Sequence, residues 1–433
     1  MDLLNTLASR ISDKFKPFLF YDNTELCFND LTSQNLSHLH CIKAGEVVAL
    51  VGDFEPQSIA NLFALIDRRV IIVPLTKATA SDHEYYFDVA NVNWIVSGNS
   101  VINRGAKGRN PLILELVNRN RGGLVLFSSG TTGIPKGVLH DTELFLEKFL
   151  TFRPAYRTLG FLLFDHIGGL NTLFHTLYND GEVVCVRNRS ANDILRNCKQ
   201  FNVEVLPTTP TFLRMLLLSD LIPESVPDSI KVITYGTERM DQNTLNELCL
   251  LLPEVDFRQT YGLSELGIFR VKSESRNSLF MKIGGTGVSY RVNQTGTLEV
   301  FSPNKMLGYL NAPSPFDLDG YYDTKDVVEV KGEFIKIVGR DSDVINVGGL
   351  KFMASEIELR ILQYGGIDFV KVFSVNNPVT GQHVEAIVQV SSDSHNFDVK
   401  SLKDFLKTVL PSHMIPMRIK QDRIGVSHRF KKE

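Results

Sequence analysis

The sequence is poor in the features that mark several large classes of protein. It has five cysteines in 433 residues, an odd number, with neither CxxC spacing nor a Cys/His ligand pattern. A disulfide scaffold and a structural zinc site are therefore not predicted, and the thiols suit a reducing compartment. No apolar run approaches the ~20 residues that a membrane span needs, and Met1–Asn5 does not open a signal peptide. We expect a cytoplasmic protein without a transmembrane segment.

An excess of charge of one sign is also lacking. The chain has 46 Lys and Arg against 49 Asp and Glu, a net charge of −3. This balance offers no electrostatic attraction for nucleic acid, which we do not expect as a partner. A hydrophobic share of 43% with 22% charged residues is ordinary for a globular protein. Because 433 residues exceed what one core usually holds, two or three domains are predicted.

Alternating apolar segments predict a large α/β domain built of several subdomains over residues 1–339. Buried strands are expected at 47–51, 70–73 and 93–96, with a helix at 57–67 between the first two. This spacing of strand, helix and strand implies parallel pairing. Further strands are expected at 161–164, 183–186, 203–206 and 232–234.

The composition changes near Gly339, after an expected strand at 334–338. Ser355–Glu358 has the S-x-x-E form of a capping box that opens a short helix. Alternating apolar residues at 370–372 and 386–390 predict strands, and an apolar face over 402–410 predicts a helix that Pro411 ends. The sequence thus predicts a small, mobile α+β domain over residues 340–433.

The richest local signal is the run Ser128–Gly137, SSGTTGIPKG, which follows the apolar segment 124–127. Its glycines let successive backbone N–H groups point into one concavity, its hydroxyls add donors, and Lys136 adds positive charge. Such a loop is suited to bind a polyphosphate. It is not the Gly-x4-Gly-Lys-Ser/Thr loop of P-loop NTPases, because Lys136 follows Pro135 and precedes Gly137.

This run resembles the phosphate-binding signature of the adenylate-forming superfamily, which comprises acyl-CoA synthetases, peptide-synthetase adenylation domains and luciferases. The acyl-CoA synthetases are the most similar. Further stretches resemble family motifs in the same order, and the resemblance covers most of the chain from Leu124 onward. They are FDHIGG at 164–169 beside the acyl pocket, YGTE at 235–238 at the adenine, TYGLSE at 260–265, GYYDTKD at 320–326, and the hinge with its following segment at 339–358.

The resemblance implies an AMP-forming acid–thiol ligase. Such an enzyme joins a small carboxylic acid to the α-phosphate of ATP, releases pyrophosphate, and passes the acyl group to a thiol. The thiol belongs to coenzyme A or to the phosphopantetheine of an acyl carrier protein. Since two anions must meet, catalysis depends on cations, dipoles and positioning.

The resemblance also implies roles for single residues. Lys136 would hold the leaving phosphates, Thr131 and Glu265 would bind Mg²⁺, and Asp326 and Arg340 would contact the ribose. The implied catalytic residues are Lys136, His166 and Lys431. The other implied nucleotide- or pantetheine-binding residues are Ser128, Ser129, Gly130, Thr131, Thr132, Gly133, Tyr235, Gly236, Thr237, Glu238, Tyr261, Gly262, Ser264 and Gly349.

The acid itself has two interpretations. Asp165 matches the aspartate that binds the amino group in peptide-synthetase adenylation domains, which would make the enzyme load an amino acid onto a carrier protein. Aligning His166 with the acyl-CoA synthetase histidine instead predicts an acid without that amino group. We favour the second register, because Gly168 and Gly169 follow His166 and leave space where a substrate approaches.

The C-terminal domain departs most from the family. The hinge position falls on Ser342, although a hinge needs only residues that absorb backbone rotation. The Gly-Lys pair that precedes the family's end is missing, so the catalytic lysine is Lys431 with a one-residue deletion or Lys432 without it. A nucleotide- or acyl-binding protein without turnover is therefore a further alternative.

Overall fold

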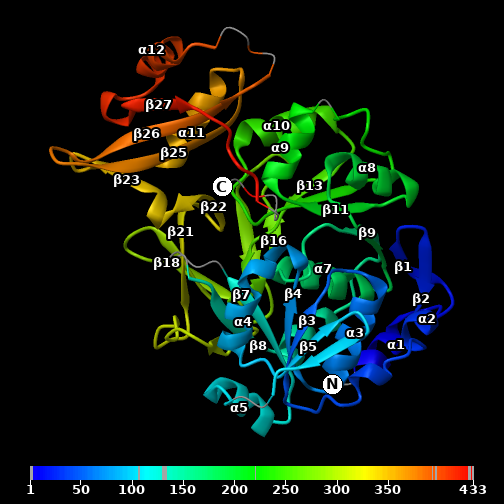
Figure 1. The fold of residues 1–433 in the computed structure, drawn as a ribbon. Coiled ribbons are helices and arrows are strands. Elements are labelled where there is room, and N and C mark those ends of the chain that lie inside the picture. The colour runs from blue at the N-terminus through cyan, green and yellow to red at the C-terminus, as the bar shows by residue number, and fades with distance from the viewer. Residues whose placement is uncertain are drawn as a thin grey trace.

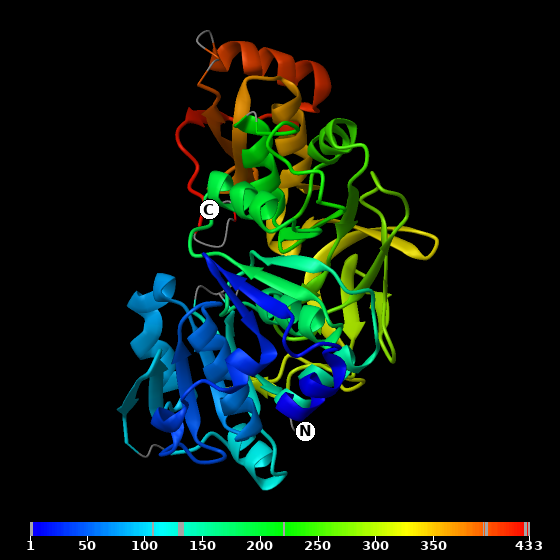
Figure 2. The ribbon, with the colours of Figure 1, turned by 90° about the vertical axis from the view of Figure 1, so that its right-hand side faces the viewer.

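The structure is a computed structural model that describes residues 3–105, 108–128, 134–219, 221–392, 394, 397–427 and 431. Figure 1 shows one large sheet, which includes β3, β4, β5 and β8, at one end of the molecule, a small α+β domain, β23 to β27, at the other, and the helices α8 to α10 with β11 and β13 beside the small domain. Figure 2 shows the same separation from the side.

The first large sheet has the strand order β20-β8-β7-β4-β3-β5-β6. Its members are β3 (Val47–Val51), β4 (Ile71–Leu75), β5 (Trp94–Ser97), β6 (Ser100–Asn103), β7 (Gly123–Ser128), β8 (Lys136–Asp141) and β20 (Gly308–Tyr309). Strand β3 pairs in parallel with β4 and β5, and β4 with β7. The helical segments beside these strands are η1 (Ser37–Leu39), α3 (Pro56–Asp67), η2 (Lys77–Asp82), α4 (His83–Ala90) and α5 (Pro111–Asn118). The strands predicted at 47–51, 70–73 and 93–96 and the helix between the first two are confirmed within two residues.

The second large sheet has the order β13-β12-β11-β9-β10-β1-β2 and is parallel except at the β1–β2 edge. Its strands are β1 (Pro17–Tyr21), β2 (Thr24–Cys27), β9 (Arg157–Gly160), β10 (Glu182–Cys185), β11 (Val205–Thr208), β12 (Val232–Tyr235) and β13 (Asp256–Gln259). The helical segments of this part are α1 (Leu3–Arg10), α2 (Phe28–Thr32), α6 (Thr142–Glu147), η3 (Lys148–Leu150), α7 (Ile167–Tyr178), α8 (Ala191–Gln200), α9 (Pro210–Leu218) and α10 (Gln242–Leu251).

The strand predicted at 161–164 is wrong. The strand is β9, which ends at Gly160, and residues 161–164 form the turn that leads into α7. Phe161 and Phe164 are nonetheless buried, at 1% and 0% exposure. A short apolar run indicates that its residues are buried, and burial alone does not distinguish a strand from a buried turn.

Helices α3 and α7 contribute side chains to a hydrophobic core that also includes strand residues of both large sheets. Phe63 of α3 and Phe174 of α7 lie with their ring centroids 6.2 Å apart, inside one cluster that includes strand residues of both sheets. Pro56 occupies the first turn of α3, where its fixed φ and missing N–H cost nothing. The apolar stripe of α3 then faces the sheets, as the sequence predicts.

The next segment forms an antiparallel sheet with the order β16-β17-β22-β21-β19-β18. Its strands are β16 (Arg270–Ser273), β17 (Met281–Gly284), β18 (Ser289–Val292), β19 (Thr297–Phe301), β21 (Tyr322–Lys331) and β22 (Phe334–Arg340). A short pair, β14 (Gly262–Leu263) and β15 (Gly267–Ile268), precedes it.

The small domain follows η4 (Asp341–Asp343). It contains β23 (Val344–Val347), β24 (Leu350–Met353), α11 (Ala354–Gln363), β25 (Ile367–Asn377), β26 (Gly381–Val390), α12 (Val399–Val409), η5 (Ser412–Met414) and β27 (Arg418–Gln421). Its buried cluster runs from Ile345 to Ile419 and includes no residue of the sheets before it.

The capping box predicted at Ser355–Glu358 is displaced by two residues. Helix α11 begins at Ala354, and the Met353 N–H donates to Glu356 Oε1 at 3.1 Å. Ser355 lies inside the first turn and donates to the Val338 carbonyl, while Glu358 accepts from the Val372 N–H. Ser355 and Glu358 thus bond to β22 and β25 instead of capping the helix. A local motif does not predict these partners, because they lie outside it.

Candidate active site

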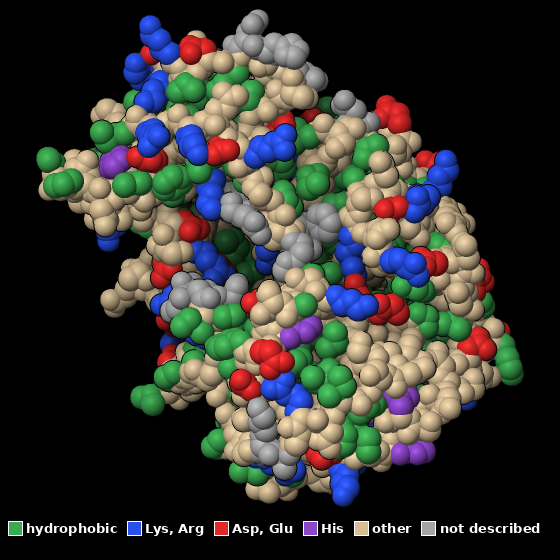
Figure 3. All heavy atoms as spheres, in the orientation of Figure 1, with side chains coloured by type: hydrophobic (Ala, Val, Ile, Leu, Met, Phe, Trp, Pro, Cys, Tyr) green, Lys and Arg blue, Asp and Glu red, His purple; other side chains and the backbone are tan. Residues whose placement is uncertain are grey.

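A cavity of about 680 Å³ lies between α7, strands β11 and β12 along their length, and the segment after β13. Figure 3 shows the surface hollowed between the small domain and the rest of the molecule, with basic side chains at the rim. Four residues that belong to widely separated motifs line the cavity: Lys136, His166, Glu265 and Lys431.

One end of the cavity combines a lysine, a carboxylate and a tyrosine. The Tyr309 hydroxyl donates to Glu265 Oε1 at 2.8 Å, and both residues are 7% exposed. Lys136 Nζ lies 4.9 Å from the centroid of the Tyr309 ring. Burial, and then the Glu265 carboxylate, raise the pKa of Tyr309 well above its usual range, so the phenol stays a donor. Pairing of β20 with β8 sets Tyr309 opposite Val138 and thereby beside Lys136.

Ser128 and Lys136 also line this end, where β7 ends and β8 begins. The predicted phosphate-binding residues Ser129, Gly130, Thr131, Thr132 and Gly133, including the predicted Mg²⁺ ligand Thr131, lie outside the described residues.

The segment that carries Glu265 is supported from behind by a buried histidine. Burial lowers the pKa of His140 to about 4, so its imidazole is neutral. His140 Nε2 lies 2.6 Å from the Ser264 carbonyl oxygen and donates to it as N–H. Gly262 and Ser264 line the cavity beside Glu265.

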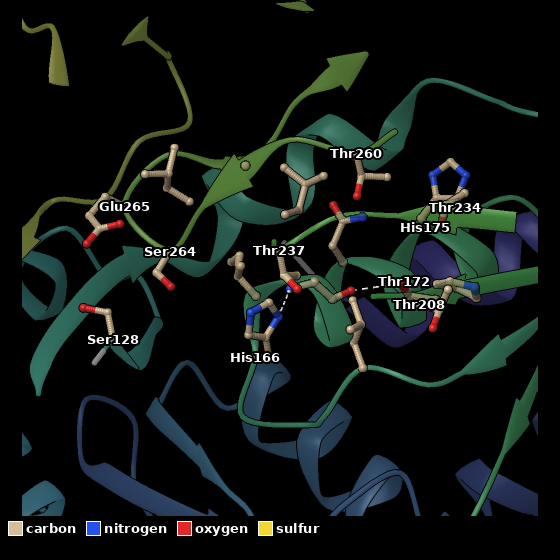
Figure 4. Close-up of a pocket in the computed structure, with 18 of the residues that line it drawn as sticks. Ser128, His166, Thr172, His175, Thr208, Thr234, Thr237, Thr260, Ser264 and Glu265 are labelled. Atoms are coloured by element: carbon tan, nitrogen blue, oxygen red, sulfur yellow. Dashed lines mark hydrogen bonds between the residues drawn. The ribbon is translucent and has the colours of Figure 1, made fainter. Parts of the chain in front are cut away.

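His166 lies near the middle of the cavity, at the N-cap of α7. Its Nδ1 accepts from the Gly168 N–H at 3.0 Å, so a neutral imidazole carries its proton on Nε2. Figure 4 shows this bond and places His166 between Glu265 and the threonines of the other end.

Of the two glycines that follow His166, Gly168 borders the cavity and Gly169 does not. Gly168 lines the cavity, but a Cβ there would also meet Leu162 at 2.7 Å. A Cβ at Gly169 would lie 2.1 Å from the Leu163 carbonyl oxygen, so this glycine permits close packing of α7 on the preceding turn. The space near His166 therefore does not depend on Gly169.

A second cavity, of about 590 Å³, adjoins the first at the boundary with the small domain and shares five lining residues with it: Thr237, Thr260, Gly262, Leu263 and Arg340. Tyr261, Glu238 and Asp326 line only the second cavity. The Tyr261 hydroxyl donates to Asp326 Oδ2 at 2.7 Å, and Arg340 Nε lies 3.3 Å from Asp326 Oδ1. Burial raises the pKa of Asp326, although Arg340 opposes that effect.

Residues 235–238 divide between core and cavity. The Tyr235 side chain is 1% exposed within the hydrophobic cluster of the second sheet and lines neither cavity. Gly236 allows close approach, because a Cβ there would lie 2.1 Å from Thr260 Oγ1. Thr237 lines both cavities and Glu238 accepts from the Thr211 N–H.

Two C-terminal residues, Lys431 and Gly349, are predicted to act in successive steps, and they lie apart in the structure. Lys431 lines the first cavity and its backbone pairs with Ser427, whereas Lys432 lies outside the described residues. Figure 1 shows the chain after β27 leading back from the small domain toward the centre of the molecule. Gly349 is in the β23–β24 turn at φ +89° and lines neither cavity. Ser342 lies in η4, next to Arg340.

Asp165 is buried behind the site rather than in it. It is 6% exposed, its Oδ2 accepts from the Thr76 hydroxyl at 3.2 Å, and it lines neither cavity. This placement favours the register based on His166.

Sequence reasoning missed Tyr309, His140 and the polar far end of the cavity. Tyr309 and His140 reach Glu265 and Ser264 through strand pairings across long stretches of chain, and no local motif marks them. Among the described residues no three His, Cys, Asp or Glu side chains gather into a metal site, and no helix among them is long and apolar enough to cross a bilayer.

Comparison with known sequences finds a match to one family and similarity to several CoA ligases. Residues 116–322 match the family described as AMP-binding enzyme. The chain is 26% identical over 310 residues to 4-coumarate–CoA ligase 4 of Arabidopsis thaliana, and 25% identical over 331 residues to 2-succinylbenzoate–CoA ligase of Bacillus licheniformis. These matches cover 64% and 70% of this chain but 54% and 66% of the relatives. The 2-succinylbenzoate–CoA ligase of Listeria monocytogenes is 23% identical over 408 residues, covering 87% of this chain and 85% of that protein.

Solved structures share the fold over the whole chain. The anthranilate CoA ligase AuaEII in complex with anthranoyl-AMP has a TM-score of 0.82 at 15% identity, with 100% of this chain and 95% of that chain covered. The ATP-bound MatB from Rhodopseudomonas palustris has a TM-score of 0.80 at 19% identity, with 99% and 96% covered. The predicted fold, a large α/β body and a small α+β domain, is thereby confirmed.

Proposed function

We propose that this chain, which belongs to the AMP-binding enzymes of the adenylate-forming superfamily, is an AMP-forming acid–thiol ligase. It joins a carboxylic acid to the α-phosphate of ATP, releases pyrophosphate, and transfers the acyl group from AMP to a thiol. The observation that carries the proposal is the single cavity that collects Lys136, His166, Glu265 and Lys431. These residues are up to 295 positions apart in sequence, 431 minus 136, and only the fold unites them.

The basic groups of the cavity suit the first half-reaction. A carboxylate and a triphosphate repel each other, so an active site accelerates their reaction by supplying positive charge and fixed dipoles. Lys136, at the start of β8, is placed to hold the leaving phosphates. Lys431 contacts the same cavity from the C-terminal tail and would neutralise charge at the reacting α-phosphate, which keeps it, rather than Lys432, as the proposed catalytic lysine.

His166 would separate the nucleotide from the acyl chain. Its Nε2–H is the ring donor when Nδ1 accepts from Gly168, and a donor in mid-cavity can orient an acid or adenylate oxygen. The ribose would lie against Asp326 and Arg340, and the adenine against Thr237 and the turn that Gly236 permits.

The donor set also fits Mg²⁺. This ion is usually bound by one or two carboxylates together with substrate phosphates. Glu265 supplies one carboxylate beside Lys136, and Tyr309 holds that carboxylate in place. Bound there with ATP, Mg²⁺ would neutralise phosphate charge during adenylation.

The second half-reaction calls for a change in the small domain. Gly349 lies outside both cavities, so a pantetheine arm guided by it would reach the adenylate only after residues 340–433 turn about the segment at Arg340–Asp343. We propose coenzyme A as the acceptor, supported by the CoA ligases among the relatives, with a carrier protein as the alternative. All five cysteines are free, which supports a reducing, cytoplasmic location.

Pyrophosphate exchange into ATP tests the proposal. The enzyme is incubated with ATP, Mg²⁺, labelled pyrophosphate and a panel of aryl, fatty, dicarboxylic and amino acids. We expect exchange that requires one class of acid, followed by thioester formation when coenzyme A is added. Binding of ATP without exchange for any acid would overturn the ligase assignment.

A further inference from the structure

Polar side chains line the end of the cavity remote from Glu265, alongside apolar residues of β11 and β12. Figure 4 shows Thr172, Thr208, Thr234 and His175 gathered on the opposite side of His166 from Glu265. The Thr208 side chain lines the cavity, and its buried hydroxyl has no hydrogen-bond partner in the part of the chain that the structure describes. A buried hydroxyl without a partner is costly, so a polar ligand group that came within hydrogen-bond reach of it would be stabilised.

A buried lysine lies behind the cavity wall that β15 and α7 form, within electrostatic reach of both His140 and His175. Lys148 Nζ has no hydrogen-bond partner among the described residues and lies beside two rings, 5.3 Å from the centroid of Phe145 and 4.9 Å from that of Phe149. It is 3.7 Å from the point that a Cβ of Gly267 would occupy, and the next residue, Ile268, lines the cavity. Burial lowers the pKa of Lys148 to about 7.

Two cations near this end, the buried Lys148 and the exposed Arg153, have no acidic partner among the described residues. His175, on the cavity wall, has its pKa lowered first by burial and then by the nearby cations Arg153 and Lys148. Neither Arg153 nor Lys148 forms an ion pair with any acidic residue that the structure describes. A ligand anion would supply the missing counter-charge and would face a neutral imidazole and threonine hydroxyls that can donate to it.

We infer that the far end of the cavity binds a second carboxylate, and that the acid activated here is a dicarboxylic acid. Lys148 supplies the charge through the wall formed by β15 and α7, while His175 and Thr208 supply polar contacts inside the cavity. One carboxylate is activated near His166 and the other is held at this end. This inference rests on the proposed ligase function and names its substrate class.

Matched pairs of acids test the inference by pyrophosphate exchange. Glutarate and adipate are compared with their monomethyl esters, which keep the chain but remove one negative charge. We expect kcat/KM to be ten- to a hundredfold higher for the diacids, in line with about 1.5–3 kcal/mol for hydrogen bonds to a charged group. Lys148→Met, which keeps an unbranched side chain, should bring the diacid-to-ester ratio close to one through KM and leave the KM for ATP unchanged.

Two further variants complete the test: one is a control and the other is an independent check. Lys199→Met removes an exposed lysine of α8 and should leave the ratio as in the wild type. His175→Gln should lower the ratio without removing the lysine, and it decides the question if Lys148→Met does not fold. Equal loss for diacid and ester in both variants, or a wild-type preference for the esters, would overturn the inference. Exchange supported only by monocarboxylic acids would refute it while leaving the ligase function intact, whereas no exchange with any acid would refute the ligase function itself.

Discussion

Removal of one hydroxyl, in Tyr309→Phe, should separate the positioning of Glu265 from everything else at the phosphate end. The variant keeps the ring beneath Lys136 Nζ but loses the 2.8 Å hydrogen bond to Glu265 Oε1. Both partners are 7% exposed, so water does not readily replace the lost donor. A hydrogen bond to a buried charged group is worth about 1.5–3 kcal/mol, which corresponds to roughly ten- to 150-fold in a binding or rate constant.

The loss of activity should appear in adenylation, the step in which Glu265 is proposed to act. We expect pyrophosphate exchange to fall by about one to two orders of magnitude and the Mg²⁺ concentration for half-maximal exchange to rise. Transfer from supplied acyl adenylate to the thiol should change little, because that step releases AMP and needs no pyrophosphate-side metal.

Tyr321→Phe is the matched control, since Tyr321 bonds with Ser289 on an exposed face at 3.0 Å and lies outside both cavities. It should retain wild-type exchange and Mg²⁺ dependence. If Tyr309→Phe also retains both within twofold, Tyr309 does not position Glu265 and the metal role of Glu265 loses its structural support.

The remaining predictions concern the small domain, the backbone and the buried lysine. Lys431→Ala should slow adenylation far more than thioester formation from supplied acyl adenylate; equal effects on both steps would remove Lys431 from its role. Arg214→Ala removes the bonds from α9 to the carbonyls of Asp368, at 2.6 Å, and Ile367 in the small domain. It should reduce pyrophosphate exchange several-fold, whereas the surface variant Arg196→Ala should not. Lys325 has a φ of +62°, a region that favours glycine, so Lys325→Gly should raise the free energy of unfolding by about 1 kcal/mol in urea titration, and no gain would show that its backbone is unstrained. The pKa of Lys148 is about 7 in the folded state and near 10.4 when unfolded, so unfolding takes up a proton between these values. From pH 8 to 9 the wild type should therefore gain about 1.3 kcal/mol of unfolding free energy relative to Lys148→Met, with a smaller slope near pH 7, and parallel pH profiles would contradict the burial of Lys148.

Local patterns predicted the fold well where side-chain burial follows a simple period. The strands β3, β4 and β5 and helix α3 lie within two residues of their expected positions because fully buried parallel strands are continuous apolar runs. The pattern failed at 161–164, where an apolar run fills the core from a turn. It also failed at Ser355, whose hydroxyl bonds to β22 instead of capping α11.

By itself the sequence determined the class of chemistry that we propose. A glycine- and hydroxyl-rich loop with Lys136, followed in order by the segments of His166, Glu265 and Asp326, carries its meaning in residue types and spacing, which are properties of the chain alone. Only the tertiary structure decided which of these groups share a cavity. It brought Lys431 to the first cavity, left Gly349 outside it and placed Asp165 behind it, against Thr76. It also added Tyr309, His140 and Lys148, whose partners lie far away in sequence, because long-range packing and strand pairing set such contacts and no local pattern encodes them.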